Sequence, residues 1–285
     1  MNLSILFEKD AVQDLLIEKL GQVPIDFCEK ADCIKKKKDK WGAAGVLIPL
    51  AFGSQGETIP EWSLILIKRS SMVAQAGDLS CPGGMLESLD SLLRHIITCR
   101  LVPVLKGRPL KYARDRGTAD FRSITLFLAN ALRESWEEVN LSPFYVDFLG
   151  PLACRNLVMF SKTIFPLVGL VKRPWLLQPN HEVEKIINIP LRLFFQPENY
   201  GIFSMETGKN PGNTGNQTDR FTCFVYRNET GQEEILWGAT FGIIMSLLKT
   251  AFDFEVPGPT SNILRKTFSP QYLKGSRHAG REGIR

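Results

Sequence analysis

The sequence lacks the paired cysteines that mark a zinc site or a disulfide-stabilised fold. Its six cysteines are spread widely over 285 residues and never occur as C-x-x-C, the spacing typical of zinc ligands and redox motifs. A chain of this length can bury enough apolar surface to fold without disulfides. We therefore expect reduced thiols and a cytoplasmic location.

The sequence also lacks a long hydrophobic run. The longest apolar stretch, Ile235–Leu248, spans 14 residues, whereas a helix needs about 20 to cross a bilayer. The first residues have no basic segment before their apolar positions, which argues against a secretory signal. Apolar residues make up 44% of the chain and charged residues 23%, proportions that exclude a disordered or fibrous protein. We expect a globular protein with no membrane partner.

Hydrophobic patterning divides the chain into three parts. Residues 1–40 are expected to form a helix over residues 4–20 and a basic linker. Residues 256–285 are basic and rich in proline and glycine, which predicts a mobile tail. Residues 41–255 form the main domain, with a polar loop at Glu206–Asp219 and a helix near Ala239–Ala251. Its expected strands are Ala44–Phe52, Trp62–Lys68, Val146–Leu152, Ile164–Val171, Phe221–Tyr226 and Glu234–Trp237.

The strongest helical pattern covers residues 125–139. Leu128, Leu132 and Val139 lie on one face of this helix, as expected for a buried stripe. Asn140 follows the last turn, and asparagine is second only to glycine in the left-handed conformation that ends many helices. The sequence therefore predicts that the helix ends at this residue.

Three carboxylates share one turn of this helix, roughly opposite the apolar stripe: Glu134, Glu137 and Glu138. Like charges at this spacing cost an isolated helix roughly a few tenths of a kcal/mol, so a solvated acidic face is one interpretation. The other is a site for a hard divalent cation, because Mg²⁺ and Mn²⁺ prefer carboxylate oxygens. The helix alone leaves both interpretations open.

The loop before the helix adds a second motif. Pro82-Gly83-Gly84 lets the backbone approach a ligand closely, and Asp90 follows Gly84 after five residues. This G-x5-D, with R-E-S-W-E-E-V-N-L at residues 133–141, resembles the Nudix box, G-x5-E-x7-R-E-U-x-E-E-x-G-U, where U is aliphatic. More broadly, the sequence resembles the coenzyme A pyrophosphatase branch of Nudix hydrolases. The blocks that match this branch are Ile67–Ser70, Ala76–Asp90, Ala131–Val139, Asn180–Leu191 and Ile235–Thr240.

Single residues depart from the pattern of this branch. Asn140 replaces the glycine of the box, which the chemistry of helix ends tolerates. Gln75, Asp78 and Cys81 stand where the branch has histidine, glutamine and phenylalanine. These three changes concern the fine contacts with substrate.

The largest departure is an insertion within the box. From Asp90 to Arg133 there are 42 intervening residues where the pattern has 7, an insertion of 35. Because the insertion precedes the helix that carries all three glutamates, we expect the site to survive. Residues 91–124 have a net charge of +6, since eight basic side chains stand against two acidic ones. They form either a solvated, disordered loop or a set of cations that attracts a phosphate-rich substrate.

The resemblance implies a fold and a metal site. The fold is an α/β/α sandwich with a mixed β-sheet between helices. By resemblance, Arg133 pairs with Asp90 and aims Glu134, although a surface ion pair of Arg133 with Glu137 is an alternative. The implied ligands of Mg²⁺ or Mn²⁺ are Glu134, Glu137, Glu138 and a main-chain carbonyl at Gly84.

The resemblance also suggests which residues act on the substrate. Glu182 is a candidate for a further carboxylate, as a metal ligand or a general base, and an ordinary exposed acid is an equally open interpretation. The implied catalytic residues are Glu134, Glu137, Glu182 and Arg133. The implied substrate-binding residues are Arg69, Gly83 and Gly84.

The implied reaction is metal-dependent hydrolysis of a pyrophosphate bond. The expected substrate is coenzyme A or an acyl-CoA, giving 3′,5′-ADP and a 4′-phosphopantetheine product. ADP-ribose and NADH are alternative substrates, and a catalytically silent module that binds nucleotide or RNA is an alternative function. The expected partner is a small nucleotide, without specific nucleic-acid binding, because the basic segments lack interleaved aromatic residues.

Overall fold

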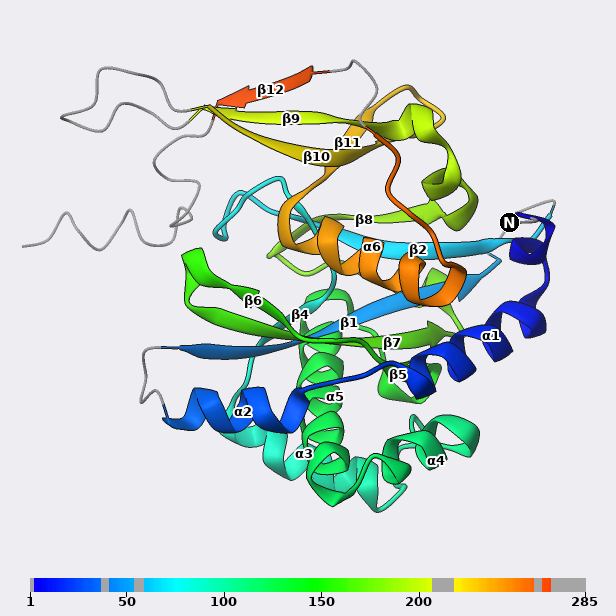
Figure 1. Cartoon of the computed structure of the whole chain (residues 1–285), viewed down its shortest axis with the longest axis vertical. Coiled ribbons are helices and arrows are strands. Elements are labelled where there is room, and N and C mark those ends of the chain that lie inside the picture. Colours follow the sequence, from blue (N-terminus) through cyan, green and yellow to red (C-terminus); the bar gives the residue numbers. More distant parts are fainter. Residues whose placement is uncertain (1–2, 37–40, 54–58, 207–217, 259–262, 268–285) are drawn as a thin grey trace, which may run out of the picture.

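The computed structural model describes residues 3–36, 41–53, 59–206, 218–258 and 263–267. Within these ranges the chain forms two β-sheets, an eight-stranded one and a four-stranded one, with helices around them (Figure 1). The strands of the larger sheet are β1 (Gly42–Phe52), β2 (Trp62–Arg69), β3 (Leu79–Ser80), β4 (Gly83–Met85), β5 (Val146–Pro151), β6 (Arg155–Leu157), β7 (Lys162–Val171) and β8 (Val183–Pro190).

The larger sheet is mixed and centres on β1. This strand runs parallel to β7 and antiparallel to β2 and β4. Nearly every residue of β1 and β7 is buried, because both faces of the sheet are covered. Strands buried on both faces read as continuous apolar runs, and this is why the sequence located β1, β2, β5 and β7 to within two residues at each end.

Helices cover both faces of this sheet. Leu47 and Phe165 face one apolar cluster, shared with α5 (Thr118–Val139). Ile48 and Val168 face a second cluster, shared with α1 (Lys9–Gln22) and α6 (Gly238–Phe252). Alternate residues of a strand point to opposite faces, so each strand contributes to both clusters. The expected α/β/α arrangement with a mixed sheet is confirmed.

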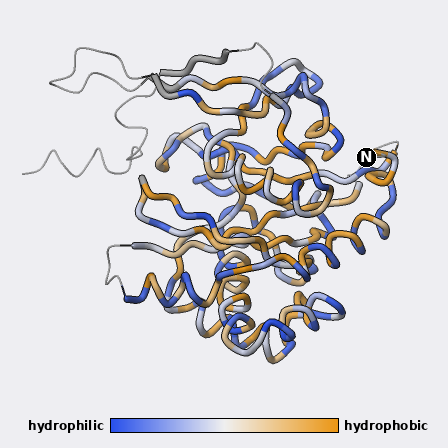
Figure 2. The backbone as a smooth tube through the Cα atoms, viewed as in Figure 1, coloured by the Kyte–Doolittle hydropathy of each residue, from blue (hydrophilic) through white to orange (hydrophobic). Residues whose placement is uncertain are grey.

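Apolar residues follow the strands of the larger sheet and the helix faces beside them (Figure 2). In the described part of the chain, no helix is both long and apolar enough to span a bilayer. All six cysteines are free thiols, as expected from their spacing.

The N-terminal segment belongs to the core. A 3₁₀ turn at Leu3–Phe7 precedes α1, so the expected helix over residues 4–20 starts later and ends later. A second helix that the sequence patterning missed, α2 (Phe27–Lys36), follows. Its Phe27 is fully buried, with ring centroids 6.0 Å from Phe127 and 5.1 Å from Phe165. Lys35 and Lys36 end this helix, and the rest of the expected basic linker lies outside the described residues.

The smaller sheet was not foreseen as a separate unit. Its order is β11 (Glu233–Leu236), β10 (Thr218–Arg227), β9 (Tyr200–Glu206) and β12 (Ile263–Thr267). Strand β12 pairs with β9 in parallel, so five residues of the tail that the sequence predicts to be mobile form a strand. Residues 207–217 of the expected polar loop and residues 268–285 of the tail lie outside the described ranges.

The insertion forms helices, so the interpretation of a disordered loop is wrong. It contains most of α3 (Ser88–Thr98), all of α4 (Gly107–Asp115) and the first turns of α5. Arg116, between α4 and α5, donates hydrogen bonds to the carbonyls of Leu20, Gly21 and Val23 at the end of α1. The last carbonyls of a helix have no partner within it, and Arg116 supplies one. The insertion thus joins the N-terminal segment to the main domain.

Candidate active site

The acidic turn of α5 lies at a well-defined helix end. Asn140 adopts the left-handed conformation, with φ 55° and ψ 31°, and its N–H bonds to the carbonyls of Ser135 and Trp136. This is the predicted end of the helix. The segment before β8 then covers the last carbonyls: the N–H of Asn180 donates to Glu138 at 2.9 Å, and that of Gln178 to Val139 at 3.0 Å. Backbone hydrogen bonds from Asn140 and from the segment before β8 therefore fix the turn that carries the glutamates.

The glycine loop contacts this turn directly. Strand β4 pairs with β1, with Gly84 opposite Gly45, and both strands lie beside α5. The N–H of Gly83 donates to Glu138 Oε2 at 3.0 Å. A Cβ atom added to Gly84 would stand 2.5 Å from both carboxylate oxygens of Glu134. The structure thus brings Gly83 and Gly84 together with Glu134 and Glu138.

Arg133 and Asp90 form a buried ion pair. Arg133 Nε lies 2.8 Å from Asp90 Oδ1, and Nη2 lies 3.3 Å from Oδ2; the Asp90 side chain is fully buried and that of Arg133 is 7% exposed. Two parallel N–H donors in this fork give a strong, directional contact. The structure contains the pair that the resemblance implies, although 42 residues separate its members.

Asp90 also fixes the start of α3. Its Oδ2 accepts the N–H of Glu87 at 2.7 Å, as part of a capping box. It also accepts a hydrogen bond from Asn130 Nδ2 at 3.0 Å. The carboxylate therefore ties the insertion to the middle of α5.

Arg133 reaches the glutamates with its remaining N–H groups. Nη1 lies 3.0 Å from Glu137 Oε2 and Nη2 lies 2.9 Å from Glu134 Oε1. The pair with Asp90 and the alternative pair with Glu137 are thus both present. Burial by itself would lower the pKa of Arg133. The hydrogen bond to Asp90 and the charges of the neighbouring carboxylates have the larger effect, so the pKa of Arg133 is raised.

Burial perturbs two of the three glutamates. The pKa of Glu138 rises to about 8 because the side chain is buried, although the Gly83 N–H and Arg69 oppose this; the charges of Glu134 and Glu182 add to the rise. Burial also raises the pKa of Glu134, against the pull of Arg133. Burial disfavours the charged form of these two carboxylates, whereas a nearby cation favours it.

Glu182 lies close enough to Glu138 for its charge to act there. Its N–H donates to Asn180 Oδ1 at 2.8 Å, and its carbonyl accepts the N–H of Ser70 at 2.8 Å. The side chain is 34% exposed, with His181 Nε2 3.7 Å from its Oε1. Glu182 therefore joins the same group of acids from the β8 side.

Arg69 ends β2 opposite Val183 of β8, and its charge acts on Glu138. Its Nε donates to the carbonyl of Ala74 at 2.8 Å. Among the residues that depart from the resemblance, Asp78 accepts a hydrogen bond from Trp237 Nε1 at 3.2 Å. Cys81 is buried, and burial raises the pKa of its thiol to about 12, so this thiol is not reactive at neutral pH.

One residue of the site was missed by the sequence reasoning. Asn130 is fully buried in α5, where its Oδ1 accepts the N–H of Gly45 at 2.7 Å and its Nδ2 donates to Met85 O at 3.0 Å. It links β1, β4 and Asp90 through one side chain. The available signal was a polar residue within an apolar helix segment, since buried amides are kept only where they are hydrogen-bonded.

The donors fit a hard cation by their chemistry. All are carboxylate oxygens, beside the carbonyls of the glycine loop, which is the ligand type that Mg²⁺ and Mn²⁺ prefer. In the arrangement observed, no three His, Cys, Asp or Glu side chains among the described residues are grouped closely enough to hold an ion. Glu134 and Glu137 instead point to Arg133, so binding an ion requires their carboxylates to turn.

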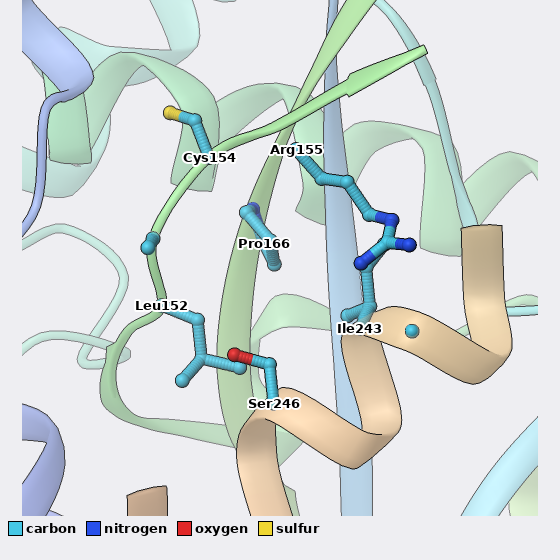
Figure 3. A pocket seen from close by; sticks show the side chains of 8 residues that line it. Leu152, Cys154, Arg155, Pro166, Ile243 and Ser246 are labelled. Atoms are coloured by element: carbon cyan, nitrogen blue, oxygen red, sulfur yellow. The ribbon is translucent and has the colours of Figure 1, made fainter.

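A cavity lies apart from these carboxylates, between α6 and the segment that leads into β6 (Figure 3). Its volume is about 80 Å³, whereas ligand pockets usually have about 300 Å³ or more. Arg155 and Ser246 are among its polar residues. None of the predicted site residues lines it, and it is too small for a nucleotide.

No protein-family model matches the chain, and no curated protein matches it. Solved structures with partial likeness include a Nudix hydrolase from M. smegmatis, RenU, at 15% identity and a TM-score of 0.33, covering 53% of this chain and 71% of that one. The match to a C. elegans Ap4A hydrolase covers 53% of this chain and 81% of that one, at 14% identity and a TM-score of 0.32. The match to a Nudix hydrolase from Nitrosomonas europaea covers 78% of this chain and 80% of that one, at 11% identity and a TM-score of 0.33. Scores this low carry no argument about the chemistry of this chain.

Proposed function

We propose that this chain is a Nudix-type hydrolase that cleaves a pyrophosphate bond with the help of a divalent metal ion. The observation that carries the proposal is the contact of Gly83 and Gly84 with Glu138 and Glu134, held by the buried pair of Arg133 and Asp90. These are the two halves of the motif that the sequence resembles. They meet in spite of the insertion between them.

The residues take complementary roles in this proposal. Glu134, Glu137 and Glu138 would hold Mg²⁺ or Mn²⁺, and the bound ion would neutralise pyrophosphate oxygens and make a water molecule more acidic. Arg133 orients Glu134 and Glu137 through its hydrogen bonds. Glu182 serves as a further ligand or accepts a proton at its carboxylate, since its charge reaches Glu138.

The proposed substrate is coenzyme A or an acyl-CoA, which yields 3′,5′-ADP and a 4′-phosphopantetheine product. Support comes from the order of the matching sequence blocks and from the position of two of them. Arg69, in the first block, lies near Glu138, and Asn180 and Glu182, in a later block, border the same acidic turn. ADP-ribose and NADH are the alternative substrates within the same reaction class.

The direct test compares hydrolysis by the wild type with that by Glu137→Gln. The Glu137 side chain is 52% exposed, so its amide variant is expected to fold normally. We expect at least about a hundredfold loss of product release from coenzyme A with Mg²⁺ or Mn²⁺, the scale of removing a major electrostatic element. Glu198→Gln is the matched control, because Glu198 is an exposed glutamate outside the site.

The same assay separates the alternatives. A panel of coenzyme A, an acyl-CoA, ADP-ribose and NADH at fixed metal concentration identifies the substrate. Equal rates for the wild type and Glu137→Gln would contradict the assignment of the metal site. Nucleotide binding without hydrolysis of any of the four compounds would favour a silent binding module.

A further inference from the structure

Asn130 reaches two strands and the insertion from the middle of α5, which packs against β1 and β4 (Figure 1). Its side chain is fully buried. Its Oδ1 accepts the N–H of Gly45, while its Nδ2 donates to Met85 O and to Asp90 Oδ2. An N–H group can only donate, whereas the carbonyl and the carboxylate can only accept, so a single orientation of the amide satisfies all three partners. These contacts therefore hold the side chain in that orientation.

The peptide bond between Met85 and Leu86 is held from two sides. The N–H of Leu86 donates to a carbonyl of β1 at 2.8 Å. The Met85 carbonyl accepts hydrogen bonds from Asn130 Nδ2 at 3.0 Å and from Arg133 Nη2 at 3.2 Å. Strand β1 and helix α5 thus fix the same peptide. Because Met85 directly follows Gly84 in β4, this peptide also fixes the backbone of the glycine loop.

Gly45 leaves room for Asn130 against β1. A Cβ atom at Gly45 would stand 2.6 Å from Asn130 Oδ1 and 2.7 Å from the carbonyl of Phe127, so any side chain there would push the helix away from the strand. Gly45 stands opposite Gly84 in the pairing of β1 with β4. Asn130 therefore binds the partner of the loop glycine that contacts Glu134.

Asn130 and Arg133 share two hydrogen-bond acceptors. Each donates to Met85 O and to Asp90 Oδ2. The distances are 3.0 Å to both acceptors from Asn130 Nδ2, and 3.2 Å and 3.3 Å from Arg133 Nη2. The same Nη2 lies 2.9 Å from Glu134 Oε1. A shift of Asn130 would move the groups that orient the Arg133 guanidinium, and the guanidinium in turn orients Glu134.

We propose that Asn130 is a positioning residue for the divalent ion, which holds the backbone at Gly84 and the guanidinium of Arg133 where the ion's ligands need them. This inference rests on the proposed metal-dependent hydrolysis and extends it to a buried side chain. Among the described residues, Asn130 forms no hydrogen bond with the three glutamates of α5, so it acts on them indirectly. Hydrogen-bonded partners of this kind orient metal ligands in many proteins.

The test measures binding of Mn²⁺ alone by electron paramagnetic resonance, in which the signal of free Mn²⁺ is lost on binding. Asn130→Asp keeps the size of the side chain and the acceptor for Gly45, but a carboxylate cannot donate the other two hydrogen bonds. We expect Mn²⁺ to bind about 10–100-fold more weakly, as when other such partners are removed. The added negative charge would by itself favour a cation, so weaker binding isolates the lost hydrogen bonds.

Thr125→Val is the matched control in the same helix. Thr125 is fully buried, and its hydroxyl donates to the carbonyls of Phe121 and Arg122 within α5. Its removal costs buried hydrogen bonds without changing the contacts of the glycine loop, so the affinity for Mn²⁺ should stay unchanged. Equal Mn²⁺ affinity in the wild type and Asn130→Asp, or equal losses in Asn130→Asp and Thr125→Val, would overturn the inference.

A measurement on the wild type does not depend on the folding of a variant. If the ion requires the contacts of Asn130, binding of the ion must stabilise those contacts in turn. Hydrogen exchange of the Gly45 N–H should therefore slow on addition of Mn²⁺ by more than that of the Phe148 N–H, which donates to the Val104 carbonyl at 2.9 Å. Equal slowing of the two amides, or none, would count against the role of Asn130.

The outcomes distinguish this inference from the proposed function. Weaker Mn²⁺ binding by Asn130→Asp, with no hydrolysis of any of the four nucleotides by the wild type, would support the role of Asn130 and contradict the pyrophosphatase. Metal-dependent hydrolysis that is sensitive to Glu137→Gln, with unchanged Mn²⁺ binding by Asn130→Asp, would support the enzyme and overturn the inference. A wild type that binds no Mn²⁺ would contradict both.

Discussion

Gly84 lies so close to the carboxylate of Glu134 that a side chain at position 84 would fit only if Glu134 moved. A Cβ atom there would stand 2.5 Å from both carboxylate oxygens, closer than any normal contact. The neighbouring Gly83 donates its N–H to Glu138. The glycine loop therefore determines where two of the three glutamates can lie.

Gly84→Ala should reduce activity more than stability. The atoms that the new methyl group meets are the end of a flexible side chain, so Glu134 can turn away at a modest cost in folding free energy. The methyl group then occupies space beside the Glu134 carboxylate and limits the orientations it can adopt toward an ion. We expect at least a roughly tenfold lower kcat, since small displacements in an active site are costly. Steady-state kinetics and thermal unfolding measure the two effects.

Gly258→Ala is the matched control for this substitution. A Cβ atom at Gly258 meets nothing within 4 Å, so both activity and melting temperature should stay unchanged. Full activity in Gly84→Ala would show that the space between Gly84 and Glu134 is not needed for catalysis.

Arg133→Lys should destabilise the protein strongly. Lysine keeps the charge but cannot bridge Asp90, Glu134 and Glu137 at once. Breaking a buried pair costs about 3–5 kcal/mol, and we expect a loss toward this value in urea unfolding. The exposed pair of Arg227 and Glu233 offers the comparison.

Arg227→Lys should change the free energy of unfolding by less than about 1 kcal/mol, as for other exposed pairs. A loss of the same small size in Arg133→Lys would mean that the buried pair adds little to the stability of the fold.

The pH dependence of stability should report the protonation of Glu138. Its pKa of about 8 lies above the ordinary value of 4.5, so the folded state binds this proton more tightly than the unfolded state. The corresponding stabilisation is complete below pH 4.5 and is lost as the pH rises toward 8. The free energy of unfolding of the metal-free protein should fall over this window, by at most about 1.4 kcal/mol per pH unit.

Glu138→Gln should remove this contribution because its amide does not titrate. The difference in unfolding free energy between the wild type and this variant, measured from pH 4.5 to 8 with a chelator present, isolates the effect of Glu138. Adding Mg²⁺ at pH 8 should stabilise the wild type more than the variant. Parallel pH curves for the two proteins would contradict the burial of this carboxylate.

The larger sheet could be predicted because its strands carry a strong local signal. The continuous apolar runs of β1 and β7 follow from burial on both faces. Helix α2 escaped notice because its ten residues include five charged ones, and one fully buried side chain, Phe27, anchors it. Strand β12 owes its existence to pairing with β9, a partner about 60 residues earlier that no local pattern reveals.

The helices of the insertion show the same limit. A high density of basic side chains suggested a solvated loop, but several of these side chains bind within the protein. Arg116 meets the carbonyls that end α1, Arg108 pairs with Asp14 of α1, and Lys106 lies 3.0 Å from Asp147. These three are engaged in holding the fold together and are not available to attract a substrate.

The sequence by itself determined the helix that carries Glu134, Glu137 and Glu138 and its end at Asn140. These features depend on residue spacing and on backbone preferences that act within a few residues. Tertiary structure decided that Asp90 meets Arg133 across the insertion and that Glu138 is buried beside Gly83. Burial and the sign of neighbouring charges depend on which distant segments pack together, and that packing sets the protonation and orientation of each side chain.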